Sequence, residues 1–571
     1  MFRNEGFNYW DDVGGVGMTD HEFPSEDGQL SRAISRRKLL GLAAAGLAAG
    51  PAAALLSGFD SPTFGAARGG PDVLAGPIKV SGTGSVSDQI GAISSAFDPM
   101  DPAVSSNGAT INLFFYCYEA LYRAELSNPT TFVPQLAAGP PMKINSLTWK
   151  VKLRPGAKFQ NGLPVTAKDV VFSFNRLVKF GPNSFLGKYV VNFKSMQASA
   201  PDEVTIHLRG PMDALLIARL AVIKVLSQAA VAKSKNALLY QPVGSGPYRV
   251  TSANPGVQCT LEKFPAYNGP MRNNFLAKKI QLPVVSDLNA ELAGLESGRF
   301  NAIAQPPLTA LASLKASSTF EVAIPSGHAI YGFLFNAGKA PFDDYRVRQA
   351  VMYGIDRNAI VTAAFDGAAS VANALVPSAN ADYTKPSTIY TYNPSKAKSL
   401  LKAAGYGGGL SFTLFAGTNI AGIVQACEIM QQQLAQIGVT VTIQQGDNQS
   451  LYAFVLAKNY EAFLAPSTPG ILGSADAEFI YRWLYYGAFP TQYLFWTGPT
   501  QVLVQQLLDK AVTAQSYPAY KSIMARVIEI VAAQGPFVPV VLADNPVAWN
   551  TKTCAEITPS HLGNLYLGRN L

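Results

Sequence analysis

The sequence contains little cysteine and little histidine, the side chains that most often hold transition metals in proteins. Four cysteines occur in 571 residues, none in a CxxC pair, and four histidines occur, none in an HExxH pattern. This scarcity argues against a zinc knuckle, a thioredoxin-type redox site and a histidine-based metal site. We therefore predict no metal and no cofactor. An oxidising compartment would allow one disulfide among Cys117, Cys259, Cys427 and Cys554, but their spacing leaves its formation open.

The sequence also lacks the short motifs of common enzyme classes. It contains no GxSxG elbow, no Walker A motif and no GxGxxG motif in a dinucleotide-binding pattern. The segment GSGPYRV at 244–250 does not lie between a predicted strand and helix, as a nucleophile elbow would. We predict a protein without catalysis, and the alternative is a secreted hydrolase with a site of unrecognised geometry.

Charge is sparse, at 14% of residues, and the lysines and arginines are scattered without a run of five. Nucleic acid is therefore not an expected partner. The 48% hydrophobic content instead predicts a well-packed chain, long enough for two or three domains.

The N-terminal region predicts export from the cytoplasm. Ser35, Arg36, Arg37 and Lys38 precede an Ala/Gly/Leu run at 39–56, and small residues follow near Ala67. This pattern is typical of a cleavable signal, and the arginine pair resembles a twin-arginine signal. A basic amphipathic helix is the alternative. Removing five of the 45 basic and eight of the 37 acidic residues with 1–67 leaves 40 and 29, a net charge of +11.

The rest of the chain alternates between strand and helix patterns. Period-2 alternation predicts a strand at 147–153, and a Thr166/Asp169 capping box predicts the start of a helix that continues to Leu177. Near the C-terminus, a strand at 410–417, a helix that ends at Gly438 and a strand at 439–445 predict a parallel pair. The fold class is therefore α/β.

Several stretches, taken together, resemble the extracytoplasmic solute-binding proteins of the peptide/nickel family (family 5), which serve ABC importers. The segment KFQNGLPVTAKDVVFSFNRL at 158–177 is similar to the signature of that family. Further matches follow in the order of the family: Met100-Asp101-Pro102, YEALYR (118–123), VPQLA (133–137), PVGSGPYRV (242–250), LESGRFNAI (295–303) and FNAGKAPFDDYRVRQAVMYGIDR (335–357).

The resemblance implies a periplasmic-binding-protein-like fold, with two α/β lobes joined by a hinge and one accessory domain. On this basis we predict a disordered N-terminus and export signal at 1–67, lobe I at 68–118, 226–327 and 536–571, accessory domain II at 119–225, and lobe III at 328–535.

The resemblance also implies candidate ligand contacts by position. Every aromatic candidate has ordinary core packing as its alternative. The candidates are Ser106, Asn107, Gly108, Phe185, Gln305, Tyr331, Tyr452, Ser467 and Asp476.

One part of the family pattern is missing. Peptide binders of the family carry a Trp and then an Asp that pairs with the amino terminus of the peptide. Here Ser467 and Gly470 stand at those places, with Asp476 as a possible substitute after rearrangement. The resemblance therefore implies a peptide-like or modestly polar solute rather than a peptide selected by its free amino group.

The predicted function is the periplasmic substrate-binding component of an ABC importer, acting as a monomer. Its expected partners are a peptide or small-molecule ligand, the permease subunits in the inner membrane and the twin-arginine translocase. The alternatives are the secreted hydrolase, a chaperone or sensor partner, and a binding protein for an oligosaccharide, an opine or a metal chelate.

Overall fold

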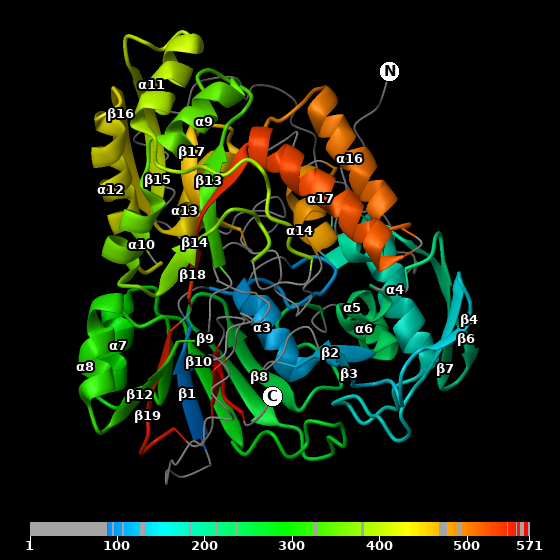
Figure 1. The fold of residues 1–571 in the computed structure, drawn as a ribbon. Helices are drawn as coiled ribbons and strands as arrows, with labels where there is room; N and C mark the ends of the chain where they lie inside the picture. Colours follow the sequence, from blue (N-terminus) through cyan, green and yellow to red (C-terminus); the bar gives the residue numbers. More distant parts are fainter. Residues whose placement is uncertain are drawn as a thin grey trace, which may run out of the picture.

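The structure is a computed structural model in which two large sheets, one smaller four-stranded sheet and the helices beside them make up the fold (Figure 1). The predicted export signal, with Arg36 and Arg37, lies outside the described residues. The described residues are 88–93, 96–105, 108–125, 132–181, 184, 186–212, 215–234, 238–324, 329–377, 382–418, 420–467, 477–487, 494–514, 516–544, 546–554, 557–559 and 565–568.

The first large sheet has seven strands, and we call it, with its helices α7 (Leu288–Glu296) and α8 (Leu311–Ala316), lobe I. Its central strand β1 runs parallel to β10 and β11, and the other neighbours are antiparallel. In spatial order the strands are β12 (Phe320–Ala323), β19 (Val547–Asn550), β11 (Ala302–Ala304), β1 (Asp88–Ala92), β10 (Lys279–Pro283), β9 (Gln258–Lys263) and β8 (Tyr248–Asn254). α3 (Gly108–Cys117) contacts β8.

The second large sheet has six strands, and with its helices it forms lobe III. The predicted strand–helix–strand unit is confirmed, because β15 and β16 are parallel from Leu410–Val439 to Gly417–Gly446 and α12 (Ile423–Ala435) connects them. In spatial order the strands are β14 (Ala369–Val371), β18 (Phe537–Ala543), β13 (Ala329–Phe335), β17 (Ala462–Ser467), β15 (Leu410–Gly417) and β16 (Val439–Gly446).

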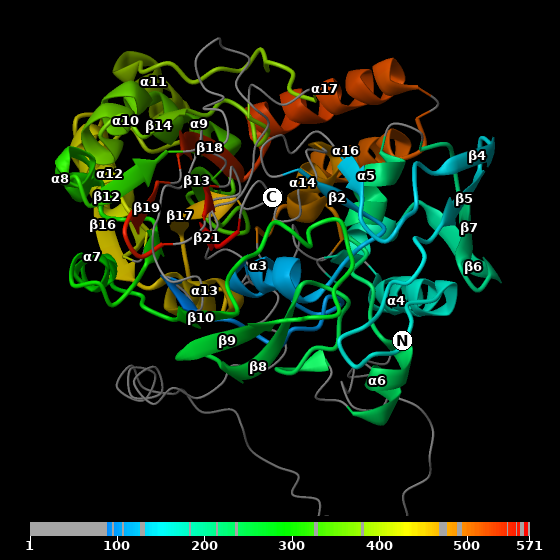
Figure 2. The same ribbon diagram turned by 90° about the horizontal axis from the view of Figure 1, so that it is seen from below.

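The helices of lobe III form two groups. Figure 2 shows α9 to α12 on the side of lobe III away from the four-stranded sheet β4–β7, and α16 and α17 on the other side. Their bounds are α9 (Tyr345–Tyr353), α10 (Arg357–Phe365), α11 (Pro394–Ala403), α13 (Asn448–Leu456), α14 (Ala477–Tyr485), α16 (Pro499–Ala511) and α17 (Tyr517–Gln534).

The four-stranded sheet and α4 (Ala167–Phe180) belong to a third unit, domain II, which also holds η3 (Leu186–Val190), α5 (Leu216–Ala221) and α6 (Gln228–Lys233). The predicted helix start is confirmed: the Asp169 carboxylate accepts from the backbone N–H and the hydroxyl of Thr166, at 3.0 and 2.6 Å. Leu147 differs from its prediction, because it lies in the turn before β5 and is 40% exposed. The strands are β4 (Met142–Asn145), β5 (Thr148–Lys152), β7 (Glu203–Leu208) and β6 (Phe193–Ala200).

The chain crosses between lobes I and III at two connections, β12 to β13 and β18 to β19. Ala323 pairs with Val547 at one end of the crossing, and Ala329 pairs with Ala543 at the other.

The residue ranges of the lobes stay a prediction, but the strand pairing differs from them at 536. β18 is hydrogen bonded to β13 and β14, so the chain returns to lobe I only at β19. The continuous apolar run of β18 identifies a buried strand, but it does not identify the sheet to which that strand belongs.

Gln160 of domain II joins that domain to lobe I. Its side-chain amide donates to the carbonyl oxygens of Cys117, Gly246 and Tyr248, at 3.0, 3.2 and 2.6 Å. The glycines of the GSGPY motif permit this contact, because a Cβ at Gly244 would lie 2.0 Å from the Cys117 oxygen. The signature segment and the GSGPY motif therefore meet at one joint between domain II and lobe I.

All four cysteines are buried and none is in a disulfide, so the disulfide that the sequence left open is not formed. Cys117 lies in α3 and Cys427 in α12. Burial raises the pKa of Cys259 to about 12 and that of Cys117 well above its usual range. Thiols of this kind are chemically inert.

Glu291 of α7 is a buried acid without a partner in lobe I. Its side chain is 0% exposed, and neither carboxyl oxygen has a hydrogen-bond partner among the described residues. Burial, and secondarily the nearby Asp287, raises the pKa of Glu291 well above the ordinary value of 4.5. The folded protein therefore holds this carboxyl in its neutral form at pH values where the unfolded chain ionises it.

Glu291→Gln is expected to increase stability more at pH 7.5 than at pH 4.5. Because the pKa of Glu291 is higher in the folded than in the unfolded protein, this carboxyl contributes stability that is fully present below pH 4.5 and is lost as the pH rises through the folded pKa. Gln does not ionise, so the variant avoids this loss at pH 7.5. Each tenfold difference between the folded and unfolded ionisation constants corresponds to about 1.4 kcal/mol of unfolding free energy. Urea unfolding at both pH values, with the exposed Glu296→Gln as control, measures the difference. An equal effect of Glu291→Gln at both pH values would contradict this account.

Candidate functional site

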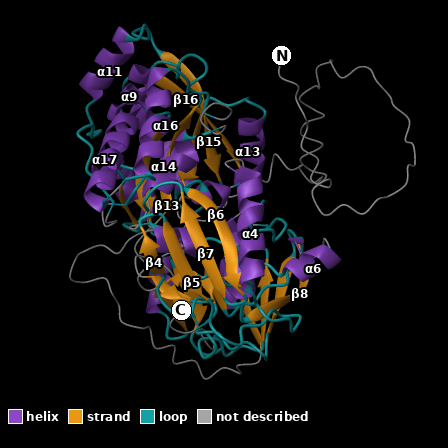
Figure 3. Cartoon of the chain, turned by 90° about the vertical axis from the view of Figure 1, so that its right-hand side faces the viewer, coloured by secondary structure: helices purple, strands orange, loops and turns teal. Residues whose placement is uncertain are grey.

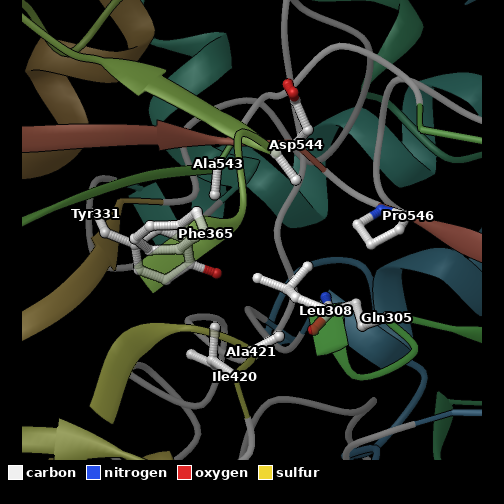
Figure 4. Close-up of a pocket in the computed structure, with 10 residues that line it drawn as sticks. Gln305, Leu308, Tyr331, Phe365, Ile420, Ala421, Ala543, Asp544 and Pro546 are labelled. Carbon is white, nitrogen blue, oxygen red and sulfur yellow. The ribbon is translucent and has the colours of Figure 1, made fainter. Parts of the chain in front are cut away.

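A small cavity lies where the chain crosses between the two lobes (Figure 4). It draws residues from both lobes. Lobe I contributes Gln305, Leu308 and Pro546. Lobe III contributes Tyr331, Phe365, Ala368, Ile420, Ala421 and Ala543, and Asp544 lies on the crossing itself.

Gln305 follows β11 and has an unusual backbone. Its φ of 58° lies in the left-handed region, which is unfavourable for residues other than Gly, Asn and Asp. The backbone N–H of Gln305 donates to the carbonyl oxygen of Pro546 at 2.9 Å, which holds the turn against the second crossing. The side chain is 7% exposed, and its amide lies at the cavity in Figure 4. A strained backbone at a cavity between two lobes is a pointer to function.

Tyr331 lies on β13, on the wall opposite Gln305. It pairs with Val541 and Pro466 on either side, and the register shifts between Tyr331 and Gly332. The ring is 1% exposed, and in Figure 4 its hydroxyl points toward the side formed by Leu308 and Gln305. Tyr331 thus offers a hydrogen-bonding group from lobe III across the cavity from an amide of lobe I.

The remaining walls are largely apolar. Phe365, Leu308 and Ile420 supply most of the large apolar surface. Asp544 is the one charged residue among the ten described residues that line the cavity, and its carboxylate points away from Tyr331 and Gln305 in Figure 4. Its backbone N–H donates to Ala368 at 2.9 Å. The cavity therefore combines apolar walls with two neutral hydrogen-bonding side chains.

The structure brings two of the predicted contact residues, Gln305 and Tyr331, together in the cavity. Gly108 is the first residue of α3, Tyr452 lies within α13, and Ser467 ends β17 opposite Ile330. Gly108 is not among the described residues that line the cavity. Four predicted contacts lie outside the described residues: Ser106, Asn107, Phe185 and Asp476.

Sequence reasoning missed most of the apolar wall. Phe365 ends α10, and Ile420 and Ala421 precede α12, so nothing local connects them with β11. The segment Ala543 to Pro546 gave the best available signal, since an Asp and a Pro between two apolar strands mark a turn.

The described part of the chain shows neither a metal-binding cluster nor a membrane-spanning helix. It holds no group of three or more His, Cys, Asp or Glu side chains arranged to bind a metal ion. Its helices are all too short or too polar to cross a bilayer.

Comparisons with known proteins point to one family. The model of the bacterial extracellular solute-binding proteins, family 5 (Middle), matches residues 131–489. The glutathione-binding protein GsiB of Salmonella typhimurium is 31% identical over 362 residues, which cover 62% of this chain and 69% of GsiB. GsiB of Escherichia coli O157:H7 is 30% identical over 360 residues, with the same coverage of both chains.

Solved structures share the fold. A dipeptide-binding protein from Pseudoalteromonas sp. SM9913, in complex with Met-Leu, has a TM-score of 0.74 at 20% identity, covering 84% of this chain and 99% of that one. NikA from Staphylococcus aureus, in complex with Ni(L-His)2, has a TM-score of 0.71 at 18% identity, covering 84% and 98%. The predicted two-lobed, periplasmic-binding-protein-like α/β fold is thereby confirmed.

Gln305→Asn should separate the backbone role of this residue from its side-chain role. Asn tolerates the left-handed region better than Gln, so the melting temperature is expected to stay equal or to rise. The amide stands one methylene further back, so affinity for the bound solute should fall roughly 3- to 10-fold, the value of one neutral hydrogen bond. Thermal melting and calorimetry with solute released from the purified protein measure the two effects. A lower melting temperature with unchanged affinity would show a purely structural role.

Proposed function

Because this chain belongs to the bacterial extracellular solute-binding proteins of family 5, we propose that it captures a short peptide-like solute between lobes I and III for the permease of an ABC importer. The observation that carries the proposal is the cavity, to which Gln305 and Pro546 contribute from one lobe and Tyr331 and Phe365 from the other. A ligand that touches both walls favours the closed arrangement, because those contacts exist together only when the lobes meet.

The proposed role is binding without turnover. The proteins of this family that the chain resembles are binding proteins. A hydrolase would need a nucleophile next to a general base, and the described cavity wall offers only a tyrosine, a glutamine amide and one outward-pointing carboxylate. We propose that the protein acts as a monomer in the periplasm.

The chemistry of the cavity supports an uncharged, partly apolar portion of the ligand at this end. Tyr331 and Gln305 can bond amide or hydroxyl groups, while Phe365 and Leu308 exclude water. The sequence also has Ser467 and Gly470 where peptide binders of the family carry the Trp and Asp that recognise an amino terminus. Glutathione, the ligand that the names of the curated relatives state, is peptide-like and becomes the first candidate.

The ligand class is tested on the protein purified from its host, by mass spectrometry of the released solute and by calorimetry. Reduced glutathione or a related blocked peptide is the expected solute. N-acetylation of a bound peptide should change its affinity less than about 3-fold, because a buried amine–carboxylate bond would be worth roughly 1.5–3 kcal/mol, or ten- to a hundred-fold. Release of a mixture of unmodified peptides whose affinity falls tenfold on acetylation would defeat the proposal and make Asp476 the amine partner.

Export by the twin-arginine route is a further part of the proposal. Arg36→Lys together with Arg37→Lys keeps the charge but removes the paired guanidinium groups, so the precursor is expected to accumulate in the cytoplasm. Cell fractionation and immunoblotting measure this, with Arg32→Lys as a control that leaves the pair intact. Normal export of the double variant would indicate the general secretory route.

A further inference from the structure

α14 is a fully buried helix between lobe III and domain II. All nine of its residues are buried, although it carries Glu478 and Arg482. Figure 3 shows α14 and α16 above the four-stranded sheet of domain II, and Figure 1 shows α14 close to α4 and α5. The helix therefore lies at the boundary between the two units.

A chain of charges crosses this boundary. Arg219 of α5 donates to one carboxylate oxygen of Glu478 at 2.6 Å, and Nε of Arg482 donates to the other. Arg482 also bonds Asp509 of α16 at 3.1 Å. Arg219, Glu478 and Arg482 are at most 1% exposed. Glu478 thus lies between two buried cations, one from each side of the boundary.

Other contacts cross at the same place. The ring of Tyr189, in η3 of domain II, stacks on Phe479 with centroids 3.5 Å apart. The amine of Lys188 lies 4.2 Å from the centroid of the Trp483 ring. Burial, and then the nearby Arg482, lowers the pKa of Lys188 to about 7, so this amine adds little fixed charge at neutral pH. Aromatic rings therefore pack at this boundary around the ion pairs of Glu478.

Domain II is attached to lobe I. Besides the Gln160 bonds, Arg154 of domain II pairs with the buried Glu119 at 2.9 Å, and Tyr267 of lobe I donates to the same carboxylate at 3.1 Å. Arg176 of α4 also bonds Asp101, which precedes α3. These contacts join domain II to lobe I at several points, so the two should move as one body.

α14, in contrast, is attached to lobe III. The backbone N–H of Ala477 donates to Asp382 at 2.9 Å, and that of Glu478 donates to the hydroxyl of Tyr520 on α17 at 3.1 Å. Tyr485 donates to the carbonyl oxygen of Phe537 on β18 at 3.0 Å. A hinge motion at the two crossings would therefore separate α14 from domain II.

We propose that the Arg219–Glu478 pair is a closing contact, which forms when lobe III meets domain II around a bound solute and separates when the lobes open, with Glu478 as its positioning residue. The proposal rests on the two-lobe capture proposed above. A buried ion pair suits this role, because the loss of hydration on burial roughly cancels the attraction. The contact then selects one closed geometry and still allows solute release.

Glu478→Gln changes the contact in a predictable direction. The side chain keeps its size, but Arg219 and Arg482 are left as two buried cations on opposite sides of the boundary. Their repulsion and the loss of the Glu478 carboxylate from both disfavour closure, and the ratio of closed to open protein should fall about tenfold or more. Adding Arg219→Met to Glu478→Gln removes the cation on the domain II side and should restore part of the closed population.

Glu119→Gln is a matched control. It also removes a buried carboxylate bonded to an arginine, but that pair lies within the body formed by lobe I and domain II. Burial raises the pKa of Glu119 to about 7, and Arg154 opposes this shift. The control should lower the melting temperature without changing the distance between the lobes.

The experiment is a spin-label distance measurement between domain II and lobe III. Val178→Cys on α4 and Val502→Cys on α16 supply exposed label sites, at 45% and 47% exposure, while the native thiols are all buried. In protein that keeps the solute with which it is purified, Glu478→Gln should show longer distances than the parent and Glu119→Gln the same distances as the parent. Arg219→Met, which leaves Glu478 bonded to Arg482, should show a smaller shift in the same direction and substitutes if Glu478→Gln does not fold.

Two outcomes separate this proposal from the proposed function. If both Glu478→Gln and Arg219→Met lower the melting temperature but keep the parental distances, the pair is a static contact and the closing role is wrong. If reduced glutathione leaves the distances of the solute-free parent unchanged while Glu478→Gln lengthens those of the solute-bound protein, the proposed ligand is wrong and the closing contact stands.

Discussion

The two crossings between lobes I and III constrain the rest of the molecule. Each end of the crossing is fixed by strand pairing, Ala323 with Val547 on one side and Ala329 with Ala543 on the other. The segments between these pairs are short, so they place residues of both sheets within reach of one small volume. The cavity lies there, and the left-handed backbone of Gln305 is held by a bond to Pro546 of the second crossing. The hinge and the candidate binding site are thus built from the same segments.

The three units divide the mechanical roles between them. Domain II follows lobe I, because the bonds of Gln160 and the bond from Tyr267 to Glu119 join them at several points. Lobe III meets the resulting body at the crossings, where the cavity lies, and again at α14, where Glu478 bonds Arg219. Residues near the crossings line the cavity and can contact the solute. The contacts between α14 and domain II lie elsewhere and include the buried rings of Tyr189 and Phe479. Under the proposed closing role of α14, affinity depends also on a surface that the ligand does not touch.

Sequence reasoning succeeded where the information is local. The capping box of α4 and the parallel pair β15 and β16 follow from spacing and residue type alone. The resemblance to a family added Gln305 and Tyr331, which do line one cavity. It could not supply Phe365 or Ile420, whose neighbours in space are remote in sequence. β18 was assigned to the wrong sheet because an apolar run states that a strand is buried but not between which partners.

The state of the cysteines has a consequence for how the protein matures. All four thiols are buried and none is in a disulfide, and burial raises the pKa of Cys117 and of Cys259, so little thiolate is present to exchange with disulfides. Folding of this chain consumes no oxidant and needs no disulfide isomerase. The native state is equally accessible in a reducing and in an oxidising compartment, so the side of the membrane on which folding occurs is free to be set by the export machinery rather than by redox chemistry.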